Sequence, residues 1–195
     1  QLFIAGKKVP DELKLAFEKD NIQIINYGDV DNVITNLAAD AKVLFDHNCV
    51  NSKLAGLIPE TCEKLDEISI TTTLKAIKNS VEIDHFRACH IKDGAAVVRF
   101  LKWLDENVAS GQVSELSASA QLESYRQEID TFKGLSFTTI PGYGANGAMM
   151  HYASTEQSNC TIGRDNFFLV DSGGQYFDGT TDITRTMCYG DMSDS

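Results

Sequence analysis

The sequence lacks any long hydrophobic run. Its longest apolar stretches, such as residues 167–170, are only a few residues long, whereas a membrane-spanning helix needs about 20. No signal peptide opens the chain either. We therefore expect no membrane partner.

Paired cysteines and zinc-type histidine motifs are also missing. The five cysteines form no C-x-x-C pair, and the four histidines include no H-E-x-x-H sequence. This pattern excludes a disulfide framework and a zinc-finger signature. It favours a reducing, cytoplasmic location.

Positive charge is scarce. There are 17 Lys and Arg residues against 28 Asp and Glu, which leaves a net charge of −11. Nucleic acid is therefore excluded as the main partner, because phosphate binding needs a basic patch. The hydrophobic fraction of 43% is ordinary for a globular protein and too high for a disordered one.

Both ends of the chain favour a piece of a longer protein. The chain begins with Gln1 rather than Met, and it stops at Ser195 soon after a strand-like segment. The alternative is a trimmed tag followed by a natural terminus.

Residues 1–76 alternate helical and strand patterns. A helix is expected to begin after Pro10, because Leu13, Ala16 and Phe17 follow helical spacing. Further helices are predicted at 30–39 and 49–58, and short strands at 22–26 and 43–45. Thr71–Thr73 is predicted to break the pattern. This alternation indicates a small α/β domain.

Residues 77–195 begin with helices and continue with strands, an α+β arrangement. A long helix is expected from an N-cap at Ser80 to about Asn107, and a second from an N-cap at Ser114 to Gly134. Strands are predicted at 136–140, 148–152, 167–177 and 180–188. The last two form a hairpin around Asp178-Gly179.

The hairpin carries two aspartates of interest. Asp171 ends an apolar strand run, where a carboxylate must be hydrogen-bonded, paired or metal-bound. Asp182 lies on the return strand, and two such acids suit a hard divalent cation. A strict turn places Asp171 opposite Thr186, so direct pairing of the acids needs a register shift of about four residues, for which a bulge at Gly173-Gly174 is available. The alternative is a hairpin with solvent-facing acids.

His151 follows a glycine-rich loop. A histidine in this position is either a core or rim residue or a catalytic group. As a neutral imidazole it could donate to a polarised carbonyl or shuttle a proton.

Three segments in the same order resemble one protein family. Residues 168–186 (FLVDSGGQYFDGTTDITRT) are similar to the metal-binding segment of aminopeptidase P, a pita-bread metallopeptidase related to prolidase. Residues 74–93 resemble the join between that family's middle and catalytic domains, and residues 146–152 resemble its substrate-side histidine strand. The resemblance implies an α+β fold: the first half of a pita-bread catalytic domain, preceded by part of a creatinase N-terminal-like domain.

The resemblance also implies a chemistry. Two divalent ions, usually manganese, with zinc or cobalt as alternatives, would share two Asp, one His and two Glu ligands; Asp171 and Asp182 match the two Asp. His151 matches a histidine that binds substrate or shuttles protons, and Thr184 and Arg185 would hold the acids in place. The implied substrates are peptides with proline in the second position, cleaved by a metal-bridging hydroxide. A homodimer is also implied.

The sequence departs from the family pattern in one important respect. The remaining His and two Glu ligands lie beyond the second Asp in the family, and residues 183–195 contain neither residue type. Ser154 also stands where the family has proline. The chain alone is therefore expected to bind metal weakly and to be inactive. The alternatives are a truncated, non-catalytic module that binds peptides or a partner, and a related dipeptidase such as prolidase.

Overall fold

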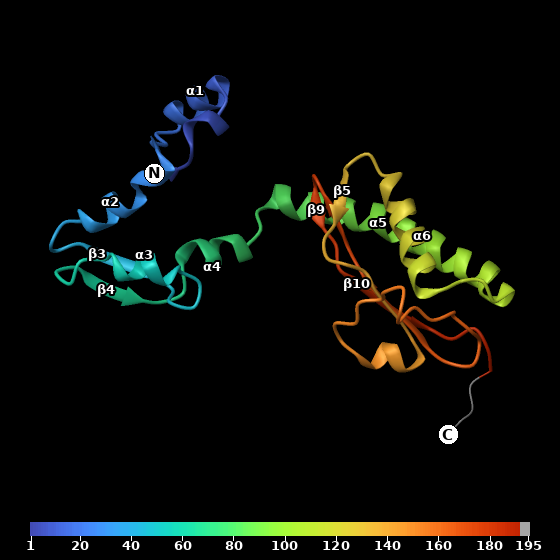
Figure 1. Ribbon diagram of the computed structural model, residues 1–195. Coiled ribbons are helices and arrows are strands. Elements are labelled where there is room, and N and C mark those ends of the chain that lie inside the picture. The colour runs from blue at the N-terminus through green and yellow to red at the C-terminus, as the bar shows by residue number, and fades with distance from the viewer. Residues whose placement is uncertain (192–195) are drawn as a thin grey trace. The chain divides into compact units, whose positions relative to one another are not determined.

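The computed structural model describes residues 1–191, so the last four residues of the predicted second domain lie outside the described range. The chain divides into two compact units, Gln1–Ile77 and Lys78–Ser195, which run from blue to green and from green to red in Figure 1. None of the helices within residues 1–191 combines the length and the hydrophobicity that a membrane span requires.

The first unit is built from short elements. Its strands form two parallel pairs, β1 (Leu2–Phe3) with β2 (Ile24–Ile25) and β3 (Lys42–Phe45) with β4 (Glu63–Asp66). Its helices are α1 (Asp11–Lys19), α2 (Val30–Thr35), α3 (Ser52–Gly56) and α4 (Ile70–Ala76), with 3-10 turns η1 (Gly6–Lys8) and η2 (Tyr27–Asp29). The predicted alternation of helix and strand is confirmed.

The prediction that Thr71–Thr73 breaks this pattern is wrong, because these residues lie in α4. The carbonyl of Ser69 accepts hydrogen bonds from the amides of Thr72 and Thr73 at 2.9 and 3.3 Å. Threonine is only slightly unfavourable in a helix, so local hydrogen bonding decides the conformation.

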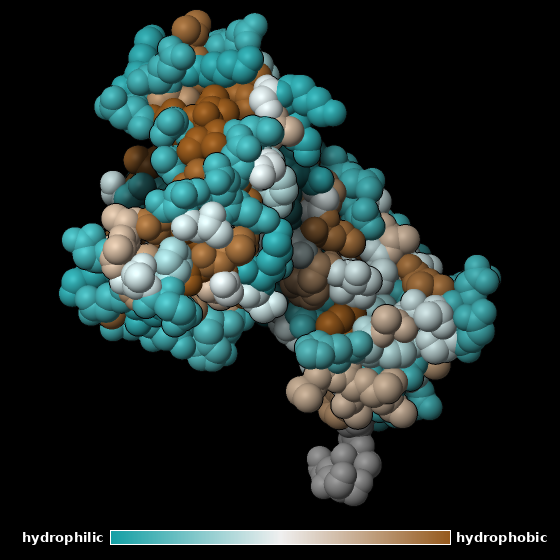
Figure 2. Space-filling model, turned by 60° about the vertical axis from the view of Figure 1, so that its left-hand side comes forward, coloured by the Kyte–Doolittle hydropathy of each residue, from teal (hydrophilic) through white to brown (hydrophobic). Residues whose placement is uncertain are grey.

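The first unit has a thin core. Among residues 1–77, all of which the structure describes, the buried apolar side chains are those of Val9, Ile58 and Cys62. Large apolar side chains remain exposed on both units, and Figure 2 shows brown patches at the surface among the teal.

Two helices open the second unit. Helix α5 (Ser80–Asn107) begins one residue earlier than predicted. Its N-cap is Asn79, whose side chain accepts from the Glu82 amide at 2.9 Å while the Glu82 carboxylate accepts from the Asn79 amide at 2.8 Å. After the 3-10 turn η3 (Val108–Ser110), helix α6 (Glu115–Gln127) has the predicted N-cap, Ser114.

Helix α6 ends earlier than predicted. It stops at Gln127, and Phe132 already belongs to a strand paired with Tyr176. Gly134 has a φ of +148° and lies at a shift in the strand register rather than at a helix end. The apolar Ile129 and Phe132 continue the helical spacing by coincidence, because they also fit a turn and a strand.

The strands form two three-stranded antiparallel sheets, ordered β10-β7-β6 and β5-β8-β9. Their bounds are β5 (Phe132–Leu135), β6 (Ile140–Tyr143), β7 (Phe168–Ser172), β8 (Gly174–Tyr176), β9 (Gly179–Thr180) and β10 (Ile183–Met187). The predicted strand at 148–152 is wrong: the 3-10 helix η4 (Gly144–Ala148) and a turn occupy this region.

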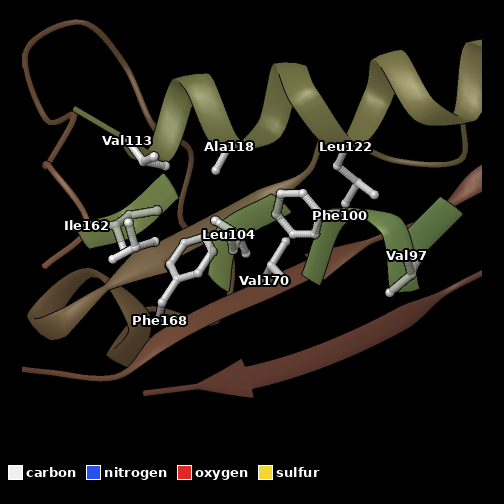
Figure 3. Packing of buried hydrophobic residues seen from close by; sticks show 10 residues of the cluster. Val97, Phe100, Leu104, Val113, Ala118, Leu122, Ile162, Phe168 and Val170 are labelled. Atoms are coloured by element: carbon white, nitrogen blue, oxygen red, sulfur yellow. The ribbon is translucent and has the colours of Figure 1, made fainter. Parts of the chain in front are cut away.

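The core of the second unit lies between the helices and strand β7. Phe100 and Leu104 of α5, Ala118 and Leu122 of α6 and Phe168 of β7 are at most 1% exposed. Figure 3 shows these side chains filling the space between the two helices and the strand. The helices therefore cover one face of β7, which we call the core face; the opposite face we call the open face.

Candidate metal centre

The hairpin that carries Asp171 and Asp182 turns one residue earlier than predicted. Phe177 and Asp178 form the turn, and Tyr176 pairs with Gly179. Gly179 approaches α5 closely, since a Cβ added there would lie 3.2 Å from atoms of the Cys89 side chain. Its pairing with Tyr176 makes it a strand residue rather than a turn residue.

The earlier turn shifts the register by two residues. Asp171 lies opposite Thr184, not opposite Thr186, so the predicted strict-turn register is wrong. Asp182 precedes Thr184 by two residues and is thus a diagonal neighbour of Asp171, not its direct partner. In a regular ladder such diagonal positions are about 7–8 Å apart.

Burial shows which face the acids share. Phe168, Val170 and Ser172 are buried on the core face, so Asp171 between them points to the open face. On the return strand Thr181 is buried, Asp182 exposed, Ile183 partly buried and Thr184 exposed. The same alternation therefore puts Asp182 on the open face with Asp171.

The two strands of the hairpin are both interrupted close to the acids. Gly173 separates β7 from β8, and Thr181 and Asp182 separate β9 from β10. The predicted bulge at Gly173-Gly174 is wrong, because the register is the same on both sides of the break: Ser172 pairs with Ile183 and Gln175 with Thr180. The break leaves Asp182 outside the ladder and exposed, so its carboxylate is open to a ligand.

Asp171 is held more firmly. The Thr184 hydroxyl donates to the Asp171 Oδ1 atom at 2.7 Å, and β7 is flanked by β6 and β10. This contact agrees with the role expected of Thr184. Arg185 instead donates to the carbonyl of Thr184 at 2.8 Å, and within residues 1–191 it orients neither Asp171 nor Asp182.

His151 lies on an exposed turn rather than in the predicted strand. The preceding η4 folds back over the open face. Gly142 pairs with Leu169 on that face, and a Cβ added to Gly142 would lie 2.5 Å from the Cα of Gly147 in η4. The loop that leads to His151 therefore starts on the same face as the two acids.

A buried network on the core face supports β7. Arg126 donates through Nε to Asp93 Oδ1 at 2.8 Å and through Nη2 to the Ser172 hydroxyl at 3.1 Å. Tyr176 donates to Asp93 Oδ1 at 2.6 Å. Sequence reasoning missed these residues, although charged positions inside an apolar helix stripe were a usable signal.

The network shifts two pKa values. Burial by itself raises the pKa of Asp93, but hydrogen bonds from Arg126 and Tyr176 outweigh it, so this pKa lies below its ordinary value. Burial, and then the hydrogen bond to Asp93, raise the pKa of Tyr176. Both shifts keep the ion pair charged and the phenol protonated near neutral pH.

A separate cluster of ligand-type side chains lies in the first unit. The ligand atoms of Asp46, His47 and Asp66 are within 4.8 Å of one another. His47 Nδ1 is 2.7 Å from Asp66 Oδ2, and this hydrogen bond raises the pKa of His47. The exposed His47–Asp66 ion pair accounts for two of the three residues, and Asp46 accepts a hydrogen bond from the Asn48 amide at 2.9 Å.

Comparison with known proteins identifies the class. Residues 84–195 match the family model described as metallopeptidase family M24, and residues 1–82 match the creatinase/prolidase N-terminal domain. The chain belongs to metallopeptidase family M24. The predicted family and the α+β pita-bread fold class are thereby confirmed.

Within this family the chain resembles aminopeptidases of the P type. It is 39% identical to a probable Xaa-Pro aminopeptidase P of Coprinopsis cinerea, over 97% of this chain and 33% of that protein. It is 36% identical to the Xaa-Pro aminopeptidase ApepP of Drosophila melanogaster, over 99% of this chain and 32% of that protein. The chain thus spans about a third of the length of the relatives it matches.

Solved structures agree on the fold. An X-prolyl aminopeptidase from Caenorhabditis elegans, described as a cytosolic enzyme with a di-nuclear active site, has a TM-score of 0.87 and 32% identity over 98% of this chain and 32% of that one. A Xaa-Pro dipeptidase from Bacillus anthracis has a TM-score of 0.75 and 22% identity over 100% of this chain and 53% of that one. The second likeness concerns the fold alone.

Proposed function

We propose that this chain is the central part of a metal-dependent aminopeptidase that releases the N-terminal residue from peptides with proline in the second position. One observation carries the proposal: the hairpin register brings Asp171 and Asp182 to neighbouring positions on the open face. The named relatives add the substrate class. In this proposal, residues 1–76 are part of the creatinase-like domain and residues 77–195 are the first half of the catalytic domain.

The two acids would hold part of a two-metal centre. Their carboxylate oxygens are hard ligands that suit manganese, and Asp182 is exposed, so an ion can reach its carboxylate. When bound, divalent ions would supply Lewis acidity, which makes water a better nucleophile and polarises a carbonyl. Thr184 keeps the Asp171 carboxylate in one orientation.

The ligand set is incomplete in this chain. Asp171 and Asp182 supply two of the five ligands that the family resemblance implies, and residues 183–195 contain no His or Glu. The chain by itself should bind metal weakly and hydrolyse no peptide. The three remaining ligands, one His and two Glu, would have to come from another segment or polypeptide.

His151 would act on the substrate side of this centre. Its exposed imidazole follows a loop that starts on the open face, so it can bind the peptide or move a proton at the leaving amine. A cytoplasmic location is part of the proposal, supported by the description of the C. elegans neighbour as cytosolic. The implied homodimer stays a prediction.

The test uses the protein isolated from its own cell. Its intact mass is measured by mass spectrometry, and its peptidase activity is then assayed with Mn²⁺. We expect cleavage of Xaa-Pro-Yaa tripeptides but not of Xaa-Pro dipeptides, and loss of both activity and bound metal in Asp171→Ala. Asp130→Ala, which removes another exposed acid of the second unit, is the matched control and should behave as the wild type.

The outcomes separate the alternatives. Cleavage of dipeptides alone would favour a prolidase-like enzyme. An intact mass near 21.4 kDa with no bound metal and no cleavage would favour a non-catalytic binding module. Near-normal turnover in Asp171→Ala would refute the metal assignment.

A further inference from the structure

Helix α6 carries two charged residues that are completely buried. Glu115 in its first turn and Arg126 in its last turn are both 0% exposed. They are eleven residues apart, and at about 100° per residue this separation brings them to the same side of the helix. Ala118 and Leu122, buried between them, complete one continuous face.

The hydrogen-bond donors to Glu115 all come from one segment of the chain. Its carboxylate accepts hydrogen bonds from five groups, all within residues 143–160. The donors are the amides of Tyr143 at 2.8 Å and Cys160 at 3.2 Å, the Asn146 Nδ2 atom at 3.0 Å, and the hydroxyls of Tyr152 at 2.8 Å and Ser154 at 3.2 Å. This segment contains η4 and His151.

Arg126 acts on the strand that carries Asp171. Its guanidinium contacts the Ser172 hydroxyl at 3.1 Å, and Ser172 directly follows Asp171. The same guanidinium pairs with Asp93 of α5, which also accepts from Tyr176 of β8. Arg126 therefore ties β7 to both helices at the residue next to the proposed metal ligand.

Core packing alone does not explain these charges. Apolar residues of similar volume would fill the same space without the desolvation cost of a buried ion. Glu115 instead binds polar groups of residues 143–160, and Arg126 binds Asp93 and the Ser172 hydroxyl next to Asp171. The anion lies at the first turn of α6 and the cation at its last turn, as the helix dipole favours.

We propose that Glu115 and Arg126 are positioning residues of the peptidase site. Glu115 holds the loop that presents His151, and Arg126 holds β7 so that Asp171 faces the metals. The inference rests on the proposed function and extends it to two residues that touch neither metal nor substrate. Such supporting contacts are typically worth about 10–100-fold in metal affinity or activity.

The test compares Glu115→Gln and Arg126→Lys in the full-length protein, using Mn²⁺ titration and Xaa-Pro-Yaa kinetics. We expect Glu115→Gln to lower kcat/KM by at least about 10-fold with metal content unchanged. Arg126→Lys should weaken Mn²⁺ binding by about 10-fold, and excess Mn²⁺ should restore its activity.

Leu122→Ala is the matched control, because Leu122 lies between the two charges on the same buried face. It should lower the melting temperature without changing KM or metal affinity. If both charge variants follow this pattern, they are merely structural and the proposal is overturned.

Two milder variants keep the proposal testable if Glu115→Gln or Arg126→Lys fails to fold. Tyr152→Phe removes one donor to Glu115, and Ser172→Ala removes one contact of Arg126 without separating it from Asp93. Tyr152→Phe should lower kcat/KM and Ser172→Ala should weaken Mn²⁺ binding, each less than the corresponding charge variant. Wild-type kinetics and metal affinity in both would refute the proposal. A wild-type protein that neither binds Mn²⁺ nor cleaves Xaa-Pro peptides would overturn the proposed function itself, and the positioning roles with it.

Discussion

The buried Asp93–Arg126 pair offers the sharpest test of the fold. Arg126 Nε lies 2.8 Å from Asp93 Oδ1, and the two side chains are 0% and 3% exposed. The Arg126 Nη1 atom is already buried without a partner among the described residues. When one member is removed, the other keeps only a neutral partner, Ser172 for Arg126 or Tyr176 for Asp93, and has no access to water.

The expected cost follows from this isolation. Removing one partner of a buried ion pair leaves an uncompensated charge and typically costs about 3–5 kcal/mol. For a unit of roughly 120 residues, a loss of this size lowers the melting temperature by roughly 10–20 °C. We expect losses in this range for Asp93→Asn and Arg126→Met.

The double variant should be no less stable than either single variant. Asn can still accept the Tyr176 hydroxyl, and Met fills the Arg126 space without charge. The two single losses should therefore fail to add by at least about 2 kcal/mol. Urea unfolding of wild type, the two single variants and the double variant, monitored by circular dichroism, gives the four free energies of the double-mutant cycle.

The control is an exposed ion pair that links α5 to the C-terminal end of α6. Arg99 of α5 contacts Glu128 at 2.7 Å, with side chains 49% and 56% exposed. Glu128→Gln should cost no more than about 1 kcal/mol. Losses of this small size for Asp93→Asn, or strictly additive losses in the cycle, would refute the argument that burial makes the Asp93–Arg126 pair critical.

Three further predictions concern single residues. The lowered pKa of Asp93 contributes stability that is present above its unfolded value of 3.8 and is lost as the pH falls through the lower folded pKa. The difference in unfolding free energy between wild type and Asp93→Asn should therefore shrink when urea unfolding is repeated at acid pH. A difference that grows there would contradict the direction of the pKa shift. Gly94→Ala, within α5 and with nothing within 4 Å of an added Cβ, should raise the unfolding free energy by about 0.5–1 kcal/mol in urea, and a loss would contradict this. Gly142→Ala, whose Cβ would lie 2.5 Å from Gly147, should displace η4, seen as faster amide exchange in residues 144–152; unchanged exchange there would disprove the close approach.

Local signals predicted the elements whose formation depends on nearby residues. Pro10 marked the start of α1, Ser114 marked the start of α6, and the Asp-Gly pair placed the hairpin within one residue of its true turn. Capping and turn preferences act over a few residues, so they can be read without the fold. The family resemblance rested on equally local motifs around Asp171 and Asp182.

The register and the buried charges depended on long-range packing. Gly179 pairs with Tyr176 and packs against Cys89 of α5, ninety positions earlier in the chain, and this register makes Asp182 the diagonal neighbour of Asp171. The segment at 148–152 avoided the predicted strand, and its Tyr152 hydroxyl and the neighbouring Asn146 amide donate to Glu115. Local sequence determined which residues could carry chemistry; contacts between distant segments decided which of them share a face, because strand register and charge burial are set by packing partners far away in the chain.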